Sequence, residues 1–259
     1  MIFDETPRES YRHNPLREVI CQLRFPTILR VATEVPTRFQ EHIRERYPLY
    51  ANERPTETLP KEINEILAGV ASPISIKQQS VHKFETESRA RLISLSQDFL
   101  AFSEKSYIRW SHFRGEIKAI EDAFRSEYSP AFYARIGLRY QNIIDKESLG
   151  LGDCPWAKLF DGSLLGILDA YEEGILDVRT HSLLRLPHSP NCYVRIRHGL
   201  TQLNKKQAYI IDSDFFTEER RDPENAFTIL DEFNRLSARF FRWAISPVLR
   251  EAMGPVAID

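Results

Sequence analysis

The stretch AFYARIGLRYQNIID, residues 131–145, decides the fold class, because apolar and polar side chains alternate along it with a period of two. One set of alternating side chains is largely apolar: Ala134, Ile136, Leu138 and Tyr140. The other set contains two arginines: Tyr133, Arg135, Gly137, Arg139 and Gln141. This alternation predicts a long strand with one buried face. The opposite face is basic, and it is therefore the first surface on which a binding site is expected.

Shorter patterns on both sides of this strand predict further strands and amphipathic helices. The expected strands are residues 17–25, 74–78, 81–87, 91–103, 175–186, 192–198 and 207–216. The expected helices are residues 36–47, 61–68, 107–128, 163–171 and 223–253, and Pro247 should kink or divide the last one. Adjacent strands with a few helices between them indicate an α+β fold, with a mainly antiparallel sheet and helices packed mostly on one face.

Residues 146–162, rich in glycine and aspartate, resemble a connector. They predict two halves, residues 1–148 and residues 149–259, the second of which ends in the long helix. Two related α+β halves are one expectation, and one compact unit is the alternative.

Composition excludes several classes of protein. The chain has 259 residues, 42% of them hydrophobic, which is ample for a buried core. A net charge of −2 argues against a generally basic nucleic-acid binder, although 26 of the 35 basic residues are arginine. Three widely spaced cysteines and a charged amino-terminal segment without an apolar core predict a reducing, cytoplasmic location.

The histidines and cysteines show no metal-ligand spacing, so no metal and no cofactor are expected. His181 and His188 flank the end of one expected strand, and His198 ends the next one. A hairpin would bring the three together, but scattered histidines are more often turn or surface residues.

Asp212 and Asp214 form a D-x-D pair whose side chains point to one face of a strand. Two-metal nucleases hold Mg²⁺ with such pairs, which makes a metal-dependent nuclease one hypothesis. The alternative is structural, because aspartates are common where a strand runs into a turn.

No nucleophile elbow and no phosphate-binding glycine loop occurs in the sequence. Ten glycines are also too few for an elaborate nucleotide loop. Whether the protein is an enzyme stays open at this point, and the missing catalytic patterns favour a protein that binds without catalysis.

Basic strand faces are the strongest remaining signal for binding. The candidate binding residues are Arg135, Arg139, Tyr133, Tyr193, Arg195 and Arg197. Arginine with aromatic side chains suits phosphates, stacked bases or an acidic protein partner. The alternative is that each arginine pairs with a carboxylate on the next strand, such as Asp212.

The carboxy-terminal helix carries more aromatic surface than one face can bury, because adjacent helical residues diverge by about 100°. Phe240, Phe241 and Trp243 are the rings concerned. Part of this cluster is expected at an interface, either in a homodimer or with another protein.

Two motifs, NPLREV at residues 14–19 and RIGLRYQN at residues 135–142, are joined by YIIDSDFF at residues 209–216 and FRWAISPVLREAM at residues 241–253. With these motifs the chain resembles, over essentially its whole length, a sporadically distributed bacterial family of about 260 residues that is thought to move horizontally. No function is assigned to that family, so no residue roles carry over. The resemblance implies an accessory role, such as phage defence or a toxin–antitoxin-like partnership.

Overall fold

A computed structural model describes residues 3–53, 80–186, 189–203 and 206–257. The strands are β1 (Glu9–Tyr11), β2 (Leu16–Arg24), β3 (Leu49–Glu53), β4 (Val81–Glu85), β5 (Arg91–Ser96), β6 (Phe99–Glu104), β7 (Arg135–Ile144), β8 (Thr180–Arg185), β9 (Cys192–Leu203), β10 (Lys206–Thr217) and β11 (Pro255–Ala257). The helices are α1 (Leu29–Thr33), α2 (Thr37–Ile43), α4 (Trp110–Tyr128), α5 (Gly162–Leu165), α6 (Ile167–Ala170), α7 (Ala226–Ala244) and α8 (Pro247–Met253), with 3-10 turns η1 (Trp156–Lys158) and η2 (Pro223–Asn225).

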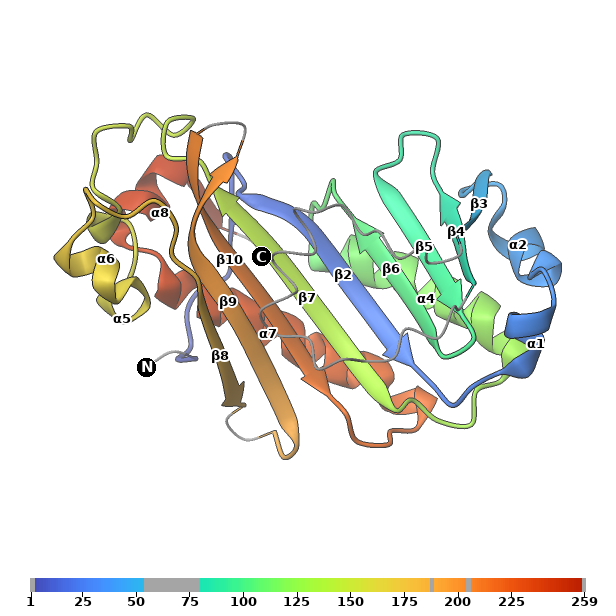
Figure 1. Ribbon diagram of the computed structural model, residues 1–259. Coiled ribbons are helices and arrows are strands. Elements are labelled where there is room, and N and C mark those ends of the chain that lie inside the picture. Colours follow the sequence, from blue (N-terminus) through green and yellow to red (C-terminus); the bar gives the residue numbers. More distant parts are fainter. Residues whose placement is uncertain (1–2, 54–79, 187–188, 204–205, 258–259) are drawn as a thin grey trace.

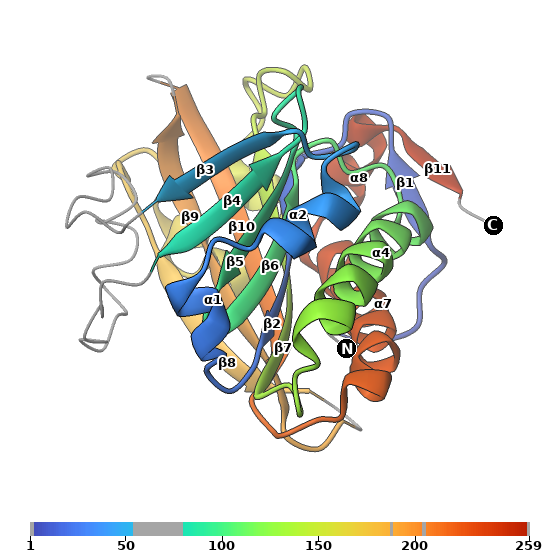
Figure 2. The same ribbon diagram turned by 90° about the vertical axis from the view of Figure 1, so that its right-hand side faces the viewer.

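A large antiparallel sheet forms the centre of the described structure (Figure 1). Its nine strands follow the order β3-β4-β5-β6-β2-β7-β10-β9-β8. Helices α4 and α7 both lie against one face of this sheet, as the side view in Figure 2 shows. The α+β class with a mainly antiparallel sheet is therefore confirmed.

β7 lies in the interior of the sheet, beside its central strand β2, and its alternation fits a strand with one buried face. Ile136, Leu138 and Ile144 are fully buried on the face that the helices cover. β7 pairs with β2 on one side and with β10 on the other. It therefore connects a strand from the amino-terminal part of the chain with one from the carboxy-terminal part. Burying each of these side chains contributes about 2 kcal/mol to folding.

Both long helices place an apolar stripe on the sheet. In α4 the stripe includes Phe113, Ile117 and Phe124, at spacings of four and seven. α7 ends at Ala244, and α8 begins at Pro247 after a Ser246 cap, so the proline divides the expected long helix. Among the described residues, no helix is long and apolar enough to cross a bilayer.

The segment expected as one strand over residues 91–103 is instead the hairpin of β5 and β6, with a turn at Gln97 and Asp98. The signal was a change of phase, because the buried apolar residues are odd-numbered before the turn and even-numbered after it. The expected helix over residues 163–171 is divided into α5 and α6 at Gly166, whose φ is +53°. β3 was not expected. The helix at 61–68 and the strand at 74–78 lie outside the described residues.

One sheet crosses the boundary that was expected at residues 148 and 149. β10, from the second half, pairs with β7, from the first, over the register Tyr209↔Ile144 to Thr217↔Ile136. β1 also pairs with β11, which ties the two terminal segments together. In the described part of the chain the two halves thus share one continuous sheet.

Gly199 in β9 is a position where we expect a large loss of stability on substitution. Its φ is +154°, and an added Cβ would lie 1.8 Å from the carbonyl oxygen of Val178. The Gly199→Ala variant should lower the free energy of unfolding by about 3 kcal/mol, measured by urea denaturation, because backbone must move to remove the clash. Gly115→Ala is the matched control, since a Cβ there meets no atom within 4 Å. It should stabilise α4 by about 1 kcal/mol. Equal effects of the two changes would contradict the close approach at Gly199.

Candidate functional site

Helices α4 and α7 cover one face of the sheet (Figure 2). The register of β7, β10 and β9 places a set of charged side chains together on the opposite face. We call this set the arginine face: Arg135, Arg139, Arg195, Arg197, Asp212 and Asp214. Period-two alternation places them there, because each strand buries its other set of side chains under the helices. The two aspartates lie on β10, between the arginines of β7 and those of β9.

The arginines of β7 reach diagonally to the aspartates of β10. Arg135 donates from Nη2 to both carboxylate oxygens of Asp214, at 2.9 and 2.8 Å, and from Nη1 to Gln22 Oε1 at 2.8 Å. Arg139 donates from Nε and Nη2 to the two oxygens of Asp212, at 2.6 and 2.7 Å. Burial opposes the charge of Arg139, but the hydrogen bonds and the attraction from Asp212 outweigh it and raise the pKa of Arg139. The cross-strand ion pairs that the sequence left open are therefore present on this strand.

The arginines of β9 make weaker contacts with the same aspartates. The Nη1 atom of Arg195 lies 3.7 Å from Asp214 Oδ2, and that of Arg197 lies 3.5 Å from Asp212 Oδ2. The side chain of Arg195 is 31% exposed, against 12% for Arg135. Arg197 Nε is buried and has no hydrogen-bond partner among the described residues. Within the described ranges, neither of these two guanidinium groups has hydrogen bonds to the aspartates as short as those of Arg135 and Arg139.

The arginine face carries a surplus of positive charge, because its four guanidinium groups outnumber Asp212, Asp214 and a third carboxylate, Glu18, whose charge also acts on Arg139. Phe216 separates two of them, with the Arg135 and Arg195 guanidinium carbons 5.0 and 5.1 Å from its ring centre. Cation–π contacts of this kind order guanidinium groups without neutralising them. The resulting arrangement favours an anionic ligand.

Gly137 has a structural role within the arginine face. A Cβ at this position would lie 2.2 Å from Arg135 Nη1, so the guanidinium group lies directly over the strand backbone. The glycine therefore allows Arg135 to reach Gln22 on one neighbouring strand and Asp214 on the other.

Tyr133 is a correction to the sequence prediction, because it does not lie on the arginine face. It is fully buried, and its hydroxyl donates to Glu121 Oε1 of α4 at 2.8 Å. β7 begins only at Arg135, and the backbone of Tyr133 forms an isolated bridge with Arg221. Tyr193 does lie on the arginine face, where its ring centre is 5.8 Å from that of Phe216.

The aromatic cluster of α7 is only partly available to a partner. Phe240 lies in the core of the chain, so the interface prediction does not extend to it. Phe241 and Trp243 are half-buried and pack against that core. The Phe241 ring meets Tyr11 edge to face at 5.9 Å. An interface at Phe241 and Trp243 stays a prediction.

The histidines considered for metal binding point apart. His181 is exposed on the same face as Arg197, its partner in register, whereas His198 is buried on the helix-covered face. His188 lies outside the described residues. Within the described ranges, no group of three histidine, cysteine, aspartate or glutamate side chains is arranged to hold a metal ion.

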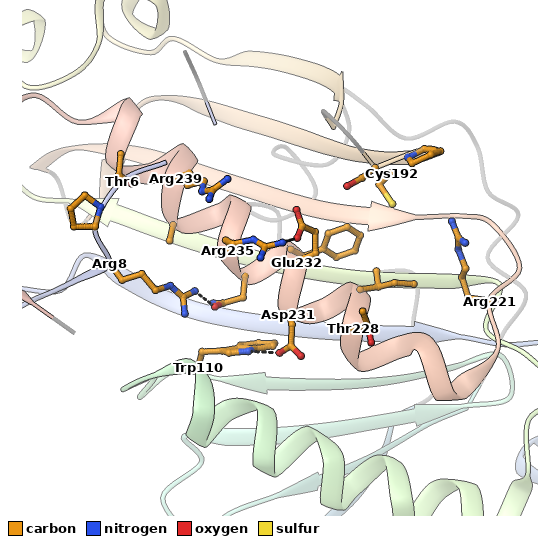
Figure 3. A pocket seen from close by; sticks show the side chains of 17 residues that line it. Thr6, Arg8, Trp110, Cys192, Arg221, Thr228, Asp231, Glu232, Arg235 and Arg239 are labelled. Atoms are coloured by element: carbon orange, nitrogen blue, oxygen red, sulfur yellow. Dashed lines mark hydrogen bonds and ion pairs between the residues drawn. The ribbon is translucent and has the colours of Figure 1, made fainter. Parts of the chain in front are cut away.

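A second charged region lies beside α7, and reasoning from strand patterns missed it. It is a hollow of about 920 Å³, called the outer groove, between α7, the segment around Arg8 and the end of β9 (Figure 3). The helix contributes Asp231, Arg235 and Arg239. Residues four apart lie on one face of a helix, so this spacing in the sequence could have indicated a charged helix face. Asp231 also accepts a hydrogen bond from Trp110 Nε1 at 2.7 Å.

Fold and site together define an α+β protein with an arginine-rich sheet face that α4 and α7 leave uncovered. No protein-family model matches the chain, and no curated protein is significantly similar to it. Its function is therefore argued from the geometry of these surfaces.

Proposed function

We propose that the protein is a non-enzymatic binding module that holds a phosphate-bearing partner, a single-stranded nucleic acid, on the arginine face. The observation that carries this proposal is the surplus of guanidinium groups over carboxylates. The family resemblance adds the setting, a bacterial accessory system of the phage-defence or toxin–antitoxin type.

Arg195 and Arg197 are the residues that we propose for contact with the partner. Their distances of 3.7 and 3.5 Å to the aspartates leave donors free for phosphate oxygens. The partly exposed ring of Tyr193 lies on the same strand face and offers a surface for base stacking. Arg135 and Arg139 hold the aspartates in place, and this role fits their two-pronged hydrogen bonds.

A metal-dependent nuclease that uses Asp212 and Asp214 is the alternative. Each carboxylate already accepts two hydrogen bonds from an arginine, so a metal ion would have to displace a guanidinium group. Because a metal ion would compete with the arginines for these carboxylates, the geometry supports nucleic-acid binding over cleavage. The experiment below tests binding and cleavage.

The Arg195→Ala, Arg197→Ala double variant should bind a fluorescently labelled single-stranded oligonucleotide at least tenfold more weakly than the wild type. The slope of log K against log salt should also flatten by about 1.4, because two phosphate contacts are lost. Fluorescence anisotropy at several salt concentrations measures both quantities. The melting temperature should change little, because both aspartates keep their partners on β7.

Arg44→Ala is the control for the loss of positive charge, since Arg44 is 61% exposed at the end of α2 and far along the chain from the arginine face. Unchanged affinity in the double variant would overturn the proposal. Competition by polyglutamate as strong as that by the oligonucleotide would assign the face to an acidic protein instead. Cleavage of the oligonucleotide with Mg²⁺ or Mn²⁺, lost in Asp212→Asn, would establish the nuclease.

A further inference from the structure

A second cavity lies on the opposite, helix-covered side of the sheet. It has a volume of about 340 Å³ and lies between β7, β10, α7 and the residues that lead into α4. We call it the inner chamber. It shares Arg8, Trp110 and Asn234 with the outer groove, so the two hollows meet where Arg8 approaches α7 (Figure 3).

Two side chains of the sheet make the floor of the inner chamber polar. Asn142 of β7 is 6% exposed and Ser213 of β10 is 2% exposed, and both line the cavity. Their strand positions face the helices, where neighbours such as Ile211 are apolar core residues. Among the described residues, neither side chain makes a hydrogen bond, and neither has a polar atom shut off from solvent, so their polar atoms open into the chamber. Polar groups in the core-facing phase of a strand need a hydrogen-bonding partner, and these two can find one only in what fills the chamber, water or a ligand.

The remaining polar groups of the inner chamber hold one another in place. Asn234 of α7 donates from Nδ2 to the Tyr140 hydroxyl at 2.7 Å, and its Oδ1 accepts a hydrogen bond from Arg8. Ser237 donates to the backbone carbonyl of Asn234 at 2.9 Å. This network fixes the walls of the chamber and leaves the donors and acceptors of Asn142 and Ser213 for whatever enters.

Aromatic rings supply much of the remaining wall. They come from four separate segments of the chain: Tyr11, Tyr107, Trp110, Tyr140 and Phe241. Tyr107 and Tyr140 meet edge to face, with ring centres 6.3 Å apart. Flat aromatic walls beside a carboxamide suit a flat, heteroaromatic ligand.

We propose that the inner chamber binds the base of a nucleoside or mononucleotide. A carboxamide presents a donor and an acceptor side by side, which complements the edge of a nucleobase, and the Ser213 hydroxyl adds a third group. Arg8 is an exposed residue at the mouth, and the donors of its guanidinium group that Asn234 does not take would meet a phosphate. This site is separate from the arginine face, since the sheet lies between them.

Isothermal titration calorimetry of the full chain with AMP, GMP, CMP and UMP, and with the four matching nucleosides, tests the proposal. At least one base should bind. Asn142→Ala should weaken that binding at least tenfold, and Ser213→Ala should weaken it severalfold. Arg8→Ala should weaken the mononucleotide more than the nucleoside if phosphate is part of the ligand, because the loss of its hydrogen bond to Asn234 affects both compounds and the loss of a phosphate contact affects only one. An equal effect of Arg8→Ala on both would identify the nucleoside as the ligand.

Ser213→Ala also keeps the test valid if Asn142→Ala fails to fold. Because its hydroxyl has no partner, its loss should leave the melting temperature of the ligand-free protein unchanged or raise it. Asn52→Ala, an exposed asparagine of β3, should not alter the affinity. No heat with any of the eight compounds at millimolar concentration would overturn the proposal, as would full affinity in both chamber variants. The Arg195→Ala, Arg197→Ala double variant should bind the base as tightly as the wild type. A failure of base binding in the inner chamber is therefore distinguishable from a failure of oligonucleotide binding on the arginine face.

Discussion

Replacing Asp212 with alanine is expected to lower the free energy of unfolding by about 4 kcal/mol, the usual cost of removing one partner from a buried ion pair. The Asp212 side chain is only 9% exposed and lies between Arg139 and Arg197. Without it, two guanidinium groups stay on the sheet with no carboxylate between them, and Arg139 loses both of its charge-assisted hydrogen bonds. Urea denaturation of the variant and the wild type measures the difference.

Asp122→Ala is the matched control, since Asp122 is 55% exposed and pairs only with Lys118 on the surface of α4. That change should cost no more than about 0.5 kcal/mol. Adding Arg139→Met to Asp212→Ala should recover part of the lost stability, because it removes a guanidinium group that has lost its counter-charge. If Asp212→Ala were as mild as Asp122→Ala, the pairs of the arginine face would be surface contacts and would not order the site.

The sequence predicts the fold well wherever periodicity is long. The alternation in β7 and the apolar stripe of α4 extend over ten and nineteen residues, and both elements were found near their expected places. Short elements are less predictable, because their patterns are brief. Nothing in LYANE marks β3, whose residues are all exposed, as a strand at the edge of the sheet.

The sequence predicts which strand face carries the candidate site, but it does not predict the contacts between its side chains. Alternation places Arg135 and Arg139 on one face, but their diagonal reach to β10 depends on the register between strands far apart in sequence. Tyr133 was assigned to the arginine face because the alternating pattern begins before β7. The backbone joins the large sheet only at Arg135. The inner chamber could not be predicted, since it joins Arg8 to residues more than a hundred positions away.

The same two strands serve both proposed sites, one on each face. In β10, Asp212 and Asp214 point to the arginine face, and Ser213 between them points under the helices. In β7, Arg139 likewise points to the arginine face, and Asn142 points under the helices into the inner chamber. The D-x-D motif attracted notice for its aspartates, yet the serine between them is the more unusual residue, because it occupies a core position. Polar residues in the buried phase of a strand are therefore a sequence signal for an internal site.

Acidification is expected to destabilise the protein through His198. This side chain is buried, and its Nδ1 lies 2.9 Å from the Tyr209 hydroxyl. Burial lowers the pKa of His198 from 6.5 to about 4. Between these values the unfolded chain binds a proton that the folded chain does not, so stability falls as the pH falls from 6.5 to about 4. Below that range both states are protonated, and the loss is complete at about 3 kcal/mol.

The free energy of unfolding at pH 7, 5.5 and 4, measured by urea denaturation of the wild type and of His198→Gln, isolates this contribution. Burial also lowers the pKa of His82, and carboxylates titrate in the same range, but these groups are common to both proteins. The variant should therefore lose about 3 kcal/mol less than the wild type between pH 7 and pH 4. His13→Gln, at an exposed position, should follow the wild-type curve. Parallel curves for wild type and His198→Gln would mean that the folded protein protonates His198 readily, and that its contact with Tyr209 is open to water.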